Sequence, residues 1–164
     1  MELREIQRPL KEGYRSDPDT ARITLVARGN QGDEPIACSV DLGRAIYEAQ
    51  AHGGVGGAGT GACSGDLLLG ALAACSQLTC QIVAESMGLE VQRVEAVVEG
   101  DLDLRGTLGI DGARVGFESI RLRLEVDAPG ATPEQLESLR RKTERYCVVL
   151  QTLRATPELS VTRA

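Results

Sequence analysis

The chain has 164 residues, of which 42% are hydrophobic and 26% are charged, and this predicts one globular domain over residues 1–164. Its net charge of −6 disfavours nucleic acids and anionic membranes as partners. Aromatic residues make up only 2% of the chain, which disfavours a stacking platform for bases and leaves aliphatic side chains to form the core.

The first third of the chain predicts a short β-meander. Residues 1–20 are polar and contain two prolines, which is typical of an arm that leads into the fold. Alternating apolar residues predict strands over 22–28 and 35–42, and residues 44–49 are a candidate third strand. The glycine-rich stretch 53–61 predicts a flexible loop.

A long apolar helix follows the loop. Ser64 is the expected N-cap, Asp66 lies in the first turn, and the helix continues to about Met87 before Gly88 ends it. Apolar residues cover most of its circumference, which predicts burial on most sides. Because Asp66 and Ser76 interrupt the apolar run, we expect no segment that spans a membrane.

The second half predicts a hairpin and two helices. Residues 91–107 and 115–128 alternate as two strands joined by a turn. A helix over 133–145 and a helical segment over 147–153 come next, and a last strand is expected at 159–162. This order of elements, with hairpins in place of crossovers, predicts an α+β fold.

The glycine-rich stretch has a second interpretation. Gly54 to Gly59 match the G-x-G-x-x-G pattern of dinucleotide-binding turns. Such a turn needs a buried parallel strand before it and an acidic residue about 20 positions later, and the sequence has neither. We therefore interpret the stretch as a loop and place a nucleotide-binding enzyme behind the hypotheses below. His52, the only histidine, is interpreted as solvated rather than as a general base.

The cysteines offer the clearest candidate chemistry. Five cysteines at irregular spacings, with no Cys-x-x-Cys pair and a charged N-terminus, predict a cytoplasmic protein with reduced thiols. Cys75 lies in the long helix among small residues that leave room for a partner, and Cys147 lies where free helix N–H groups stabilise a thiolate. From the residues alone, each of these two thiols is either inert or reactive. Cys38, Cys63 and Cys80 are interpreted as packing residues.

Two segments resemble the cysteine motifs of the OsmC/Ohr family, the osmotically inducible protein C-like and organic hydroperoxide resistance proteins. Asp66-Leu-Leu-Leu-Gly-Ala-Leu-Ala-Ala-Cys75 resembles the first motif. Glu144-Arg-Tyr-Cys147-Val-Val-Leu-Gln-Thr-Leu153 resembles the second, with Val148 where the best-studied peroxidases have proline. The order of predicted elements matches the family over about residues 20–163.

The resemblance implies an intertwined homodimer with its active sites at the subunit interface. It also implies thiol-dependent reduction of organic hydroperoxides in oxidative stress defence. In that chemistry Cys75 attacks the O–O bond, becomes a sulfenic acid and forms a disulfide with Cys147. A dithiol reductant such as a lipoylated protein would restore the thiols, and no metal or bound cofactor is implied.

Two further site residues follow from the resemblance. The family's peroxidases place an N-terminal arginine against the reactive thiol, and Arg15 is the nearest match, ahead of Arg22 and Arg28. They also carry a glutamate where this chain has Gly65, with Asp66 as the candidate substitute one position later. These departures define a divergent branch. They leave a second hypothesis, a non-catalytic protein that binds an apolar or acyl ligand at the dimer interface.

Overall fold

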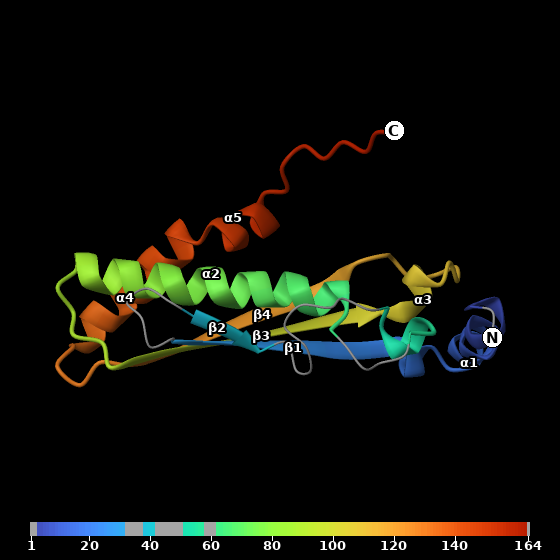
Figure 1. The fold of residues 1–164 in the computed structure, drawn as a ribbon, viewed down its shortest axis with the longest axis horizontal. Coiled ribbons are helices and arrows are strands. Elements are labelled where there is room, and N and C mark those ends of the chain that lie inside the picture. The colour runs from blue at the N-terminus through green and yellow to red at the C-terminus, as the bar shows by residue number, and fades with distance from the viewer. Residues whose placement is uncertain (1–2, 32–37, 42–50, 58–61, 164) are drawn as a thin grey trace.

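A computed structural model describes residues 3–31, 38–41, 51–57 and 62–163. The described strands form one antiparallel sheet in the order β2-β1-β3-β4. The long helix α2 lies along one face of this sheet, and α4 and α5 pack against α2 (Figure 1). The α+β class with hairpin connections is confirmed.

The four strands belong to two hairpins. The first joins β1 (Arg22–Gln31) to β2 (Cys38–Asp41), and the second joins β3 (Arg93–Asp103) to β4 (Phe117–Asp127). Strand β1 also pairs with β3, so the two hairpins share one sheet. The candidate strand at 44–49 lies outside the described residues.

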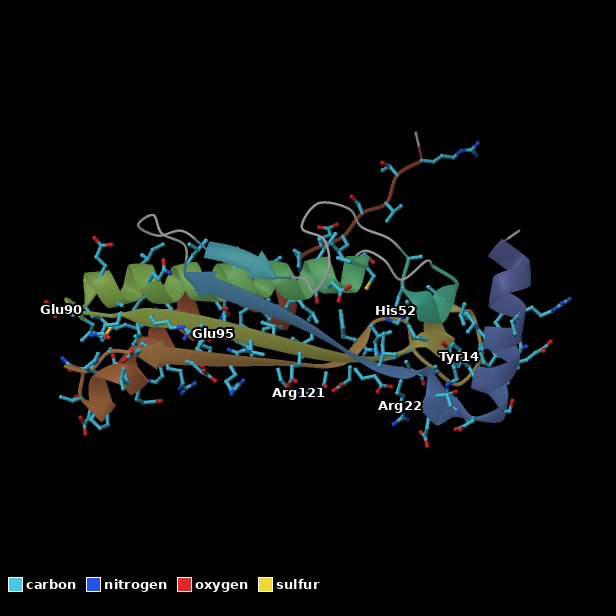
Figure 2. The ribbon with its side chains drawn as sticks, turned by 60° about the horizontal axis from the view of Figure 1, so that its bottom comes forward. Tyr14, Arg22, His52, Glu90, Glu95 and Arg121 are labelled. Carbon is cyan, nitrogen blue, oxygen red and sulfur yellow. The ribbon has the colours of Figure 1, made fainter. Side chains whose placement is uncertain are left out.

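Strand β4 has one apolar face and one charged face. Leu122 and Leu124 are partly buried on the face toward the helices, whereas Arg121 and Arg123 are exposed. Figure 2 shows Arg121 on the side of the sheet that faces away from α2. This is the alternation that the sequence predicts for a strand covered on one side.

A β-bulge interrupts the pairing of β3 with β4. Ser119 pairs with Asp101 and Phe117 pairs with Leu102, so Glu118 is one extra residue on β4. The bulge changes the phase of the alternation at this end of the strand. Phe117 therefore faces the core, where it packs against the central apolar cluster.

The predicted strand over 91–107 is too long at its C-terminal end. Strand β3 ends at Asp103, whose carboxylate accepts a hydrogen bond from the backbone N–H of Arg105 (3.0 Å) and caps the short helix α3 (Leu104–Thr107). The Arg105 guanidinium also binds this carboxylate (Nε···Oδ2, 2.9 Å), which lowers the pKa of the buried Asp103. Local capping by this side chain competes with strand pairing and ends the strand.

The described part of the predicted N-terminal arm, from residue 3 onward, forms helical structure. Helix α1 (Leu3–Ser16) is followed by the 3-10 turn η1 (Pro18–Ala21), and a second such turn, η2 (Gly53–Val55), lies nearby. The buried Tyr14 donates a hydrogen bond from its hydroxyl to the carbonyl of Gly54 (2.8 Å). This bond attaches α1 to η2, and Figure 2 shows Tyr14 and His52 at the same end of the molecule.

Helix α2 (Ser64–Ser86) begins one residue earlier than its predicted cap implies. Cys63 is the N-cap, and its backbone N–H donates to the Asp66 carboxylate (2.7 Å). The helix ends where predicted, because Gly88 adopts a left-handed conformation with φ of +65° that side chains disfavour.

Helix α2 is buried on one side and open on the other. Leu69 and Leu72 are fully buried, but Leu67, Leu68 and Ile82 are 39%, 38% and 51% exposed. The prediction of burial on most sides is therefore wrong for one face. By length and composition alone α2 is apolar enough to cross a membrane, but half of its most apolar window is buried in the fold, as in a core helix.

The C-terminal helices are α4 (Pro133–Tyr146) and α5 (Val148–Arg154), close to their predicted bounds. The strand expected at 159–162 is wrong, because residues 155–163 form no strand. This segment extends away from the body of the protomer and meets no sheet edge (Figure 1). Its apolar side chains Leu159 and Val161 are 76% and 100% exposed.

Candidate active site

The two cysteines singled out by the sequence lie side by side. Cys75 is partly exposed in the middle of α2, and Cys147 is fully buried between α4 and α5. Both residues belong to one apolar cluster, and Cys75 is close enough to Cys147 to raise the pKa of its thiol. Cys147 has an extended backbone (φ −70°, ψ 106°) that ends one helix and starts the next, so the chain turns a corner at this residue. The corner presents the Cys147 side chain to α2.

Burial controls the ionisation of Cys147. The pKa of its thiol is raised to about 11, chiefly by burial, and the hydrogen bond and charge of Cys75 raise it as well. The backbone N–H groups of Leu150 and Val149 act in the lowering direction but are outweighed. The expectation that the helix start favours a Cys147 thiolate is therefore wrong, because loss of hydration exceeds the effect of these N–H groups. Cys147 stays protonated at neutral pH.

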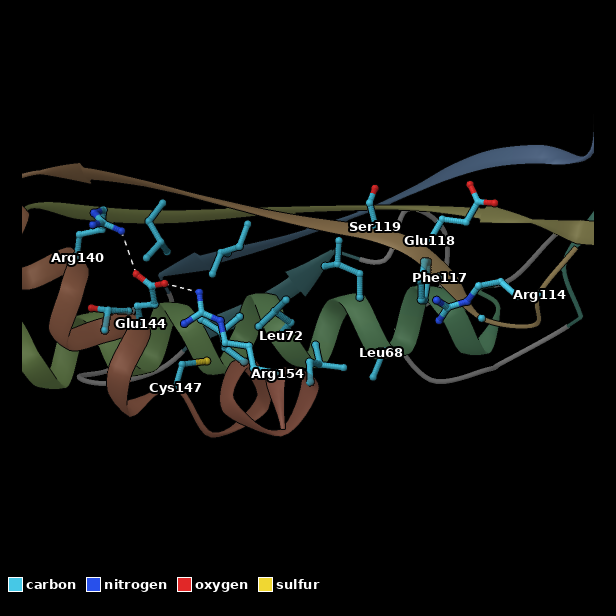
Figure 3. A pocket seen from close by; sticks show the side chains of 17 residues that line it. Leu68, Leu72, Arg114, Phe117, Glu118, Ser119, Arg140, Glu144, Cys147 and Arg154 are labelled. Atoms are coloured by element: carbon cyan, nitrogen blue, oxygen red, sulfur yellow. Dashed lines mark hydrogen bonds and ion pairs between the residues drawn. The ribbon is translucent and has the colours of Figure 1, made fainter. Parts of the chain in front are cut away.

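A pocket of about 720 Å³ lies beside Cys147, between β4 and the helices α2, α4 and α5 (Figure 3). Its wall is mostly apolar, and a few charged side chains lie at its ends. A cavity of this size and lining accommodates an apolar or amphiphilic small molecule. The apolar wall includes Leu68, Leu72, Phe117, Leu122, Leu150 and Leu153.

A charged group forms the wall of the pocket near Cys147. The Glu144 carboxylate binds Arg140 (Nη1···Oε2, 2.9 Å) through one oxygen and Arg154 through the other (Figure 3). These contacts, with Arg154 first, lower the pKa of Glu144 and keep it charged. Gln151 also donates from Nε2 to the backbone carbonyl of Glu144 (2.8 Å).

Sequence reasoning missed this charged group. Glu144, Gln151 and Arg154 recur near helical spacing on both sides of Cys147, and that periodicity was the available signal. The spacing could not show that the helix breaks at Cys147. Without the corner, the contacts across it are not predictable.

The two other predicted site residues lie away from the thiols within one chain. Asp66 is nine residues before Cys75 on the same helix, about 13 Å along the axis, and its carboxylate caps the backbone of Cys63. Arg15 is exposed at the end of α1, which contacts η1, η2 and α3, and it does not line the pocket.

The remaining candidates have local structural roles. His52 accepts a hydrogen bond at Nδ1 from the backbone N–H of Gly54 (3.0 Å) and caps the turn η2. Burial raises the pKa of both Cys63 and Cys80, as expected for packing residues. The side chain of Cys38 is outside the described part of the structure. Within the described ranges, no group of three or more His, Cys, Asp or Glu residues is arranged to hold a metal ion.

Comparisons with known proteins identify the family and similar folds. The family model for OsmC-like proteins matches residues 57–162. An OsmC-like hydroperoxide resistance protein from Jannaschia sp. CCS1 has the same fold, with a TM-score of 0.59 and 12% identity over 85% of this chain and 91% of that one. The organic hydroperoxide resistance protein OsmC from Legionella pneumophila is similar with a TM-score of 0.51 and 18% identity, over 81% and 90% of the two chains. No curated protein matches the sequence.

Proposed function

Because the chain belongs to the OsmC-like protein family, we propose that it reduces organic hydroperoxides through Cys75 and Cys147. Its fold is that of the OsmC/Ohr-like hydroperoxide resistance proteins. The observation that carries the proposal is the placement of a partly exposed thiol on α2 and a buried thiol at the α4–α5 corner in one apolar cluster, where the first raises the pKa of the second. The largely apolar pocket is lined by Cys147 and not by Cys75, and its position next to the pair supports an organic rather than an inorganic peroxide as the substrate.

The proposed reaction has three chemical steps. The Cys75 thiolate attacks one peroxide oxygen, the O–O bond breaks, and the leaving alkoxide takes a proton to become an alcohol. Cys75 is then a sulfenic acid. The Cys147 thiol condenses with it to form a disulfide and water, and a dithiol reductant, for which a lipoylated protein is a candidate, returns both residues to thiols.

The arrangement of the two thiols supports this division of roles. Cys75 is the more exposed of the two and can meet a substrate. Cys147 is buried with a raised pKa, so it is held as a thiol beside Cys75 until the sulfenic acid forms.

The proposed function also requires a cation near Cys75. Since Arg15 lies away from Cys75 within one chain, its role in the proposal needs a second protomer that brings it to the site. We propose an intertwined homodimer that acts in the cytoplasm against oxidative stress. Asp66 remains a candidate for the supporting acid only in that assembled form, since its carboxylate serves as a helix cap here.

The first prediction tests the disulfide. One equivalent of an organic hydroperoxide, such as cumene hydroperoxide, should convert Cys75 and Cys147 to a disulfide that peptide mass spectrometry detects. Cys75→Ser should consume no peroxide, because the nucleophile is gone. Cys147→Ser should consume one equivalent to form the sulfenic acid, and a second equivalent, where supplied, to form the sulfinic acid.

Controls make the result specific. Cys63→Ser should behave as the wild type does, because Cys63 is the buried N-cap of α2, twelve residues before Cys75. Both thiols remaining free after peroxide treatment would falsify the proposed function.

The pocket supports a second candidate function, a non-catalytic protein that binds an apolar or acyl ligand. In that case a medium-chain fatty acid should bind to the Cys75→Ser variant and the wild type with equal affinity in a calorimetric titration. The wild type should also leave hydroperoxides intact. Turnover of hydroperoxide with added dithiothreitol decides in favour of the enzyme.

A further inference from the structure

The corner at Cys147 is built from few backbone contacts. The Cys147 N–H donates to the carbonyl of Thr143 (2.9 Å) on the α4 side, and the Cys147 carbonyl accepts from the N–H of Gln151 (2.9 Å) on the α5 side. Neither bond joins α4 to α5 directly. Both helices pack against α2, and a contact that spans the corner further restricts the angle between them and the position of the Cys147 thiol.

Side chains supply that contact. Glu144 lies three residues before the corner and Arg154 seven residues after it, and their side chains form an ion pair. Gln151 adds a second link, from its Nε2 to the carbonyl of Glu144 (2.8 Å). Arg140 holds the other carboxylate oxygen of Glu144 and so orients it toward Arg154 (Figure 3).

We infer that Glu144 and Arg154 are positioning residues that clamp the α4–α5 corner and hold the Cys147 thiol against Cys75 for disulfide formation. We call this ion pair the corner clamp. The inference rests on the proposed function for its biological meaning, because disulfide formation is the second step of that reaction. Neither residue of the clamp is proposed to touch the substrate.

The physical basis is the effective concentration of one thiol at the other. An intramolecular disulfide forms more readily when both sulfur atoms are held at bonding distance in the reduced state. If the corner moves freely, the Cys147 sulfur also occupies positions from which it cannot form a disulfide with Cys75. The clamp has side chains that are 31% and 53% exposed, so its strength is that of a partly solvated ion pair.

The test measures the disulfide equilibrium with glutathione, which needs no peroxide. Reduced protein and oxidised glutathione exchange to protein disulfide and two reduced glutathione molecules, so the equilibrium constant reports the effective concentration directly. Glu144→Gln and Arg154→Gln should each lower this constant about three- to fivefold. The equilibrium constant of the double variant should be close to that of either single variant, because each single replacement already removes the ion pair.

A matched control lies on the same helix. Glu137 also pairs with Arg140 (2.8 Å) but is on the far side of Arg140 from the corner. Glu137→Gln removes the same charge from α4 and should leave the constant unchanged. Added salt provides a further readout. In 1 M salt the equilibrium constant of the wild type should fall toward that of Glu144→Gln, whereas the constant of Glu144→Gln should not change.

Several outcomes overturn the inference. The corner clamp is disproved if both single variants match the wild type, if Glu137→Gln lowers the constant as much, or if the wild type forms no Cys75–Cys147 disulfide at any glutathione ratio. Failure of the proposed function looks different: glutathione forms the disulfide with the predicted dependence on Glu144, whereas hydroperoxide does not. Far-UV circular dichroism on each variant verifies that a lowered constant belongs to a folded protein.

Discussion

At the scale of single residues, the two thiols differ in how water reaches them. Cys147 is fully buried and Cys75 is partly exposed, although the two side chains touch. An alkylating reagent reacts with a thiolate that it can reach, so burial and the raised pKa both slow the reaction of Cys147.

We expect iodoacetamide to distinguish the two residues by pH. With a pKa of about 11, roughly one Cys147 in a thousand is ionised at pH 8, and labelling should increase only as the pH approaches 11. Peptide mass spectrometry across pH 7–11 should show Cys75 labelled well before Cys147. Protein unfolded in urea is the control, where the two should label together. Half-maximal labelling of native Cys147 near pH 8.5 would contradict the buried position.

Sequence reasoning succeeded and failed at this scale for clear reasons. The resemblance pointed to Cys75 and Cys147, and the structure brings them together. The sequence did not predict that the pKa of Cys147 is raised, because burial depends on neighbours that are distant in sequence, such as Leu72 of α2. Its proximity to a helix start was visible locally but is the weaker influence.

At the scale of elements, Asp66 in the first turn of α2 is a candidate for two roles, helix cap and supporting acid of the site. Asp66 was a candidate for the supporting acid of the site, and in the protomer it accepts the N–H of Cys63 at the helix start. A carboxylate at this position also interacts favourably with the helix dipole.

The replacement Asp66→Ala separates these roles. Loss of the cap should lower the free energy of unfolding by about 1 kcal/mol, measured by urea denaturation. If capping is its whole role, the rate of the first reaction with hydroperoxide should be unchanged for the folded fraction. A fall in that rate of tenfold or more, with wild-type stability, would instead place Asp66 in the active site of the assembled protein.

The elements themselves were predictable where the signal is local. The cap at Thr132 and the proline at 133 fixed the start of α4, and Gly88 fixed the end of α2. The ends of β3 and of the chain were not predictable in this way. Asp103 ends its strand through a contact with Arg105, and residues 159–162 carry a strand pattern but have no partner edge in the protomer.

At the scale of the whole molecule, several large apolar side chains are exposed along the same elements. They lie on α2, at the α4–α5 corner and on the C-terminal segment, and they include Leu67, Leu68, Ile82, Tyr146, Val148, Leu159 and Val161. Monomeric proteins seldom expose so much aliphatic surface on adjoining elements. This surface supports the proposed homodimer. In the proposed homodimer, contacts between protomers account for the apolar positions of α2 that are exposed within one protomer.

The replacement Ile82→Glu tests this assembly. The wild type should sediment as a dimer. In the variant the dissociation constant of the dimer should rise at least about tenfold, because the new carboxylate loses its hydration in the interface. Within one protomer Ile82 is 51% exposed, so the fold should survive. Val115→Glu, at an even more exposed aliphatic residue in the loop before β4, is the control and should remain dimeric. A monomeric wild type would contradict the proposed assembly.

The β-bulge of the second hairpin has a consequence for how this chain tolerates changes of length. Strand β4 is a regular strand that carries one inserted residue, Glu118, and its only phenylalanine lies beyond the insertion. Deleting Glu118 would restore a continuous ladder and leave Phe117 on its present face. Deleting a residue between 120 and 126 would instead move the side chains of one part of the strand to the opposite face of the sheet. Among relatives of this protein, gaps in β4 should therefore gather at this position.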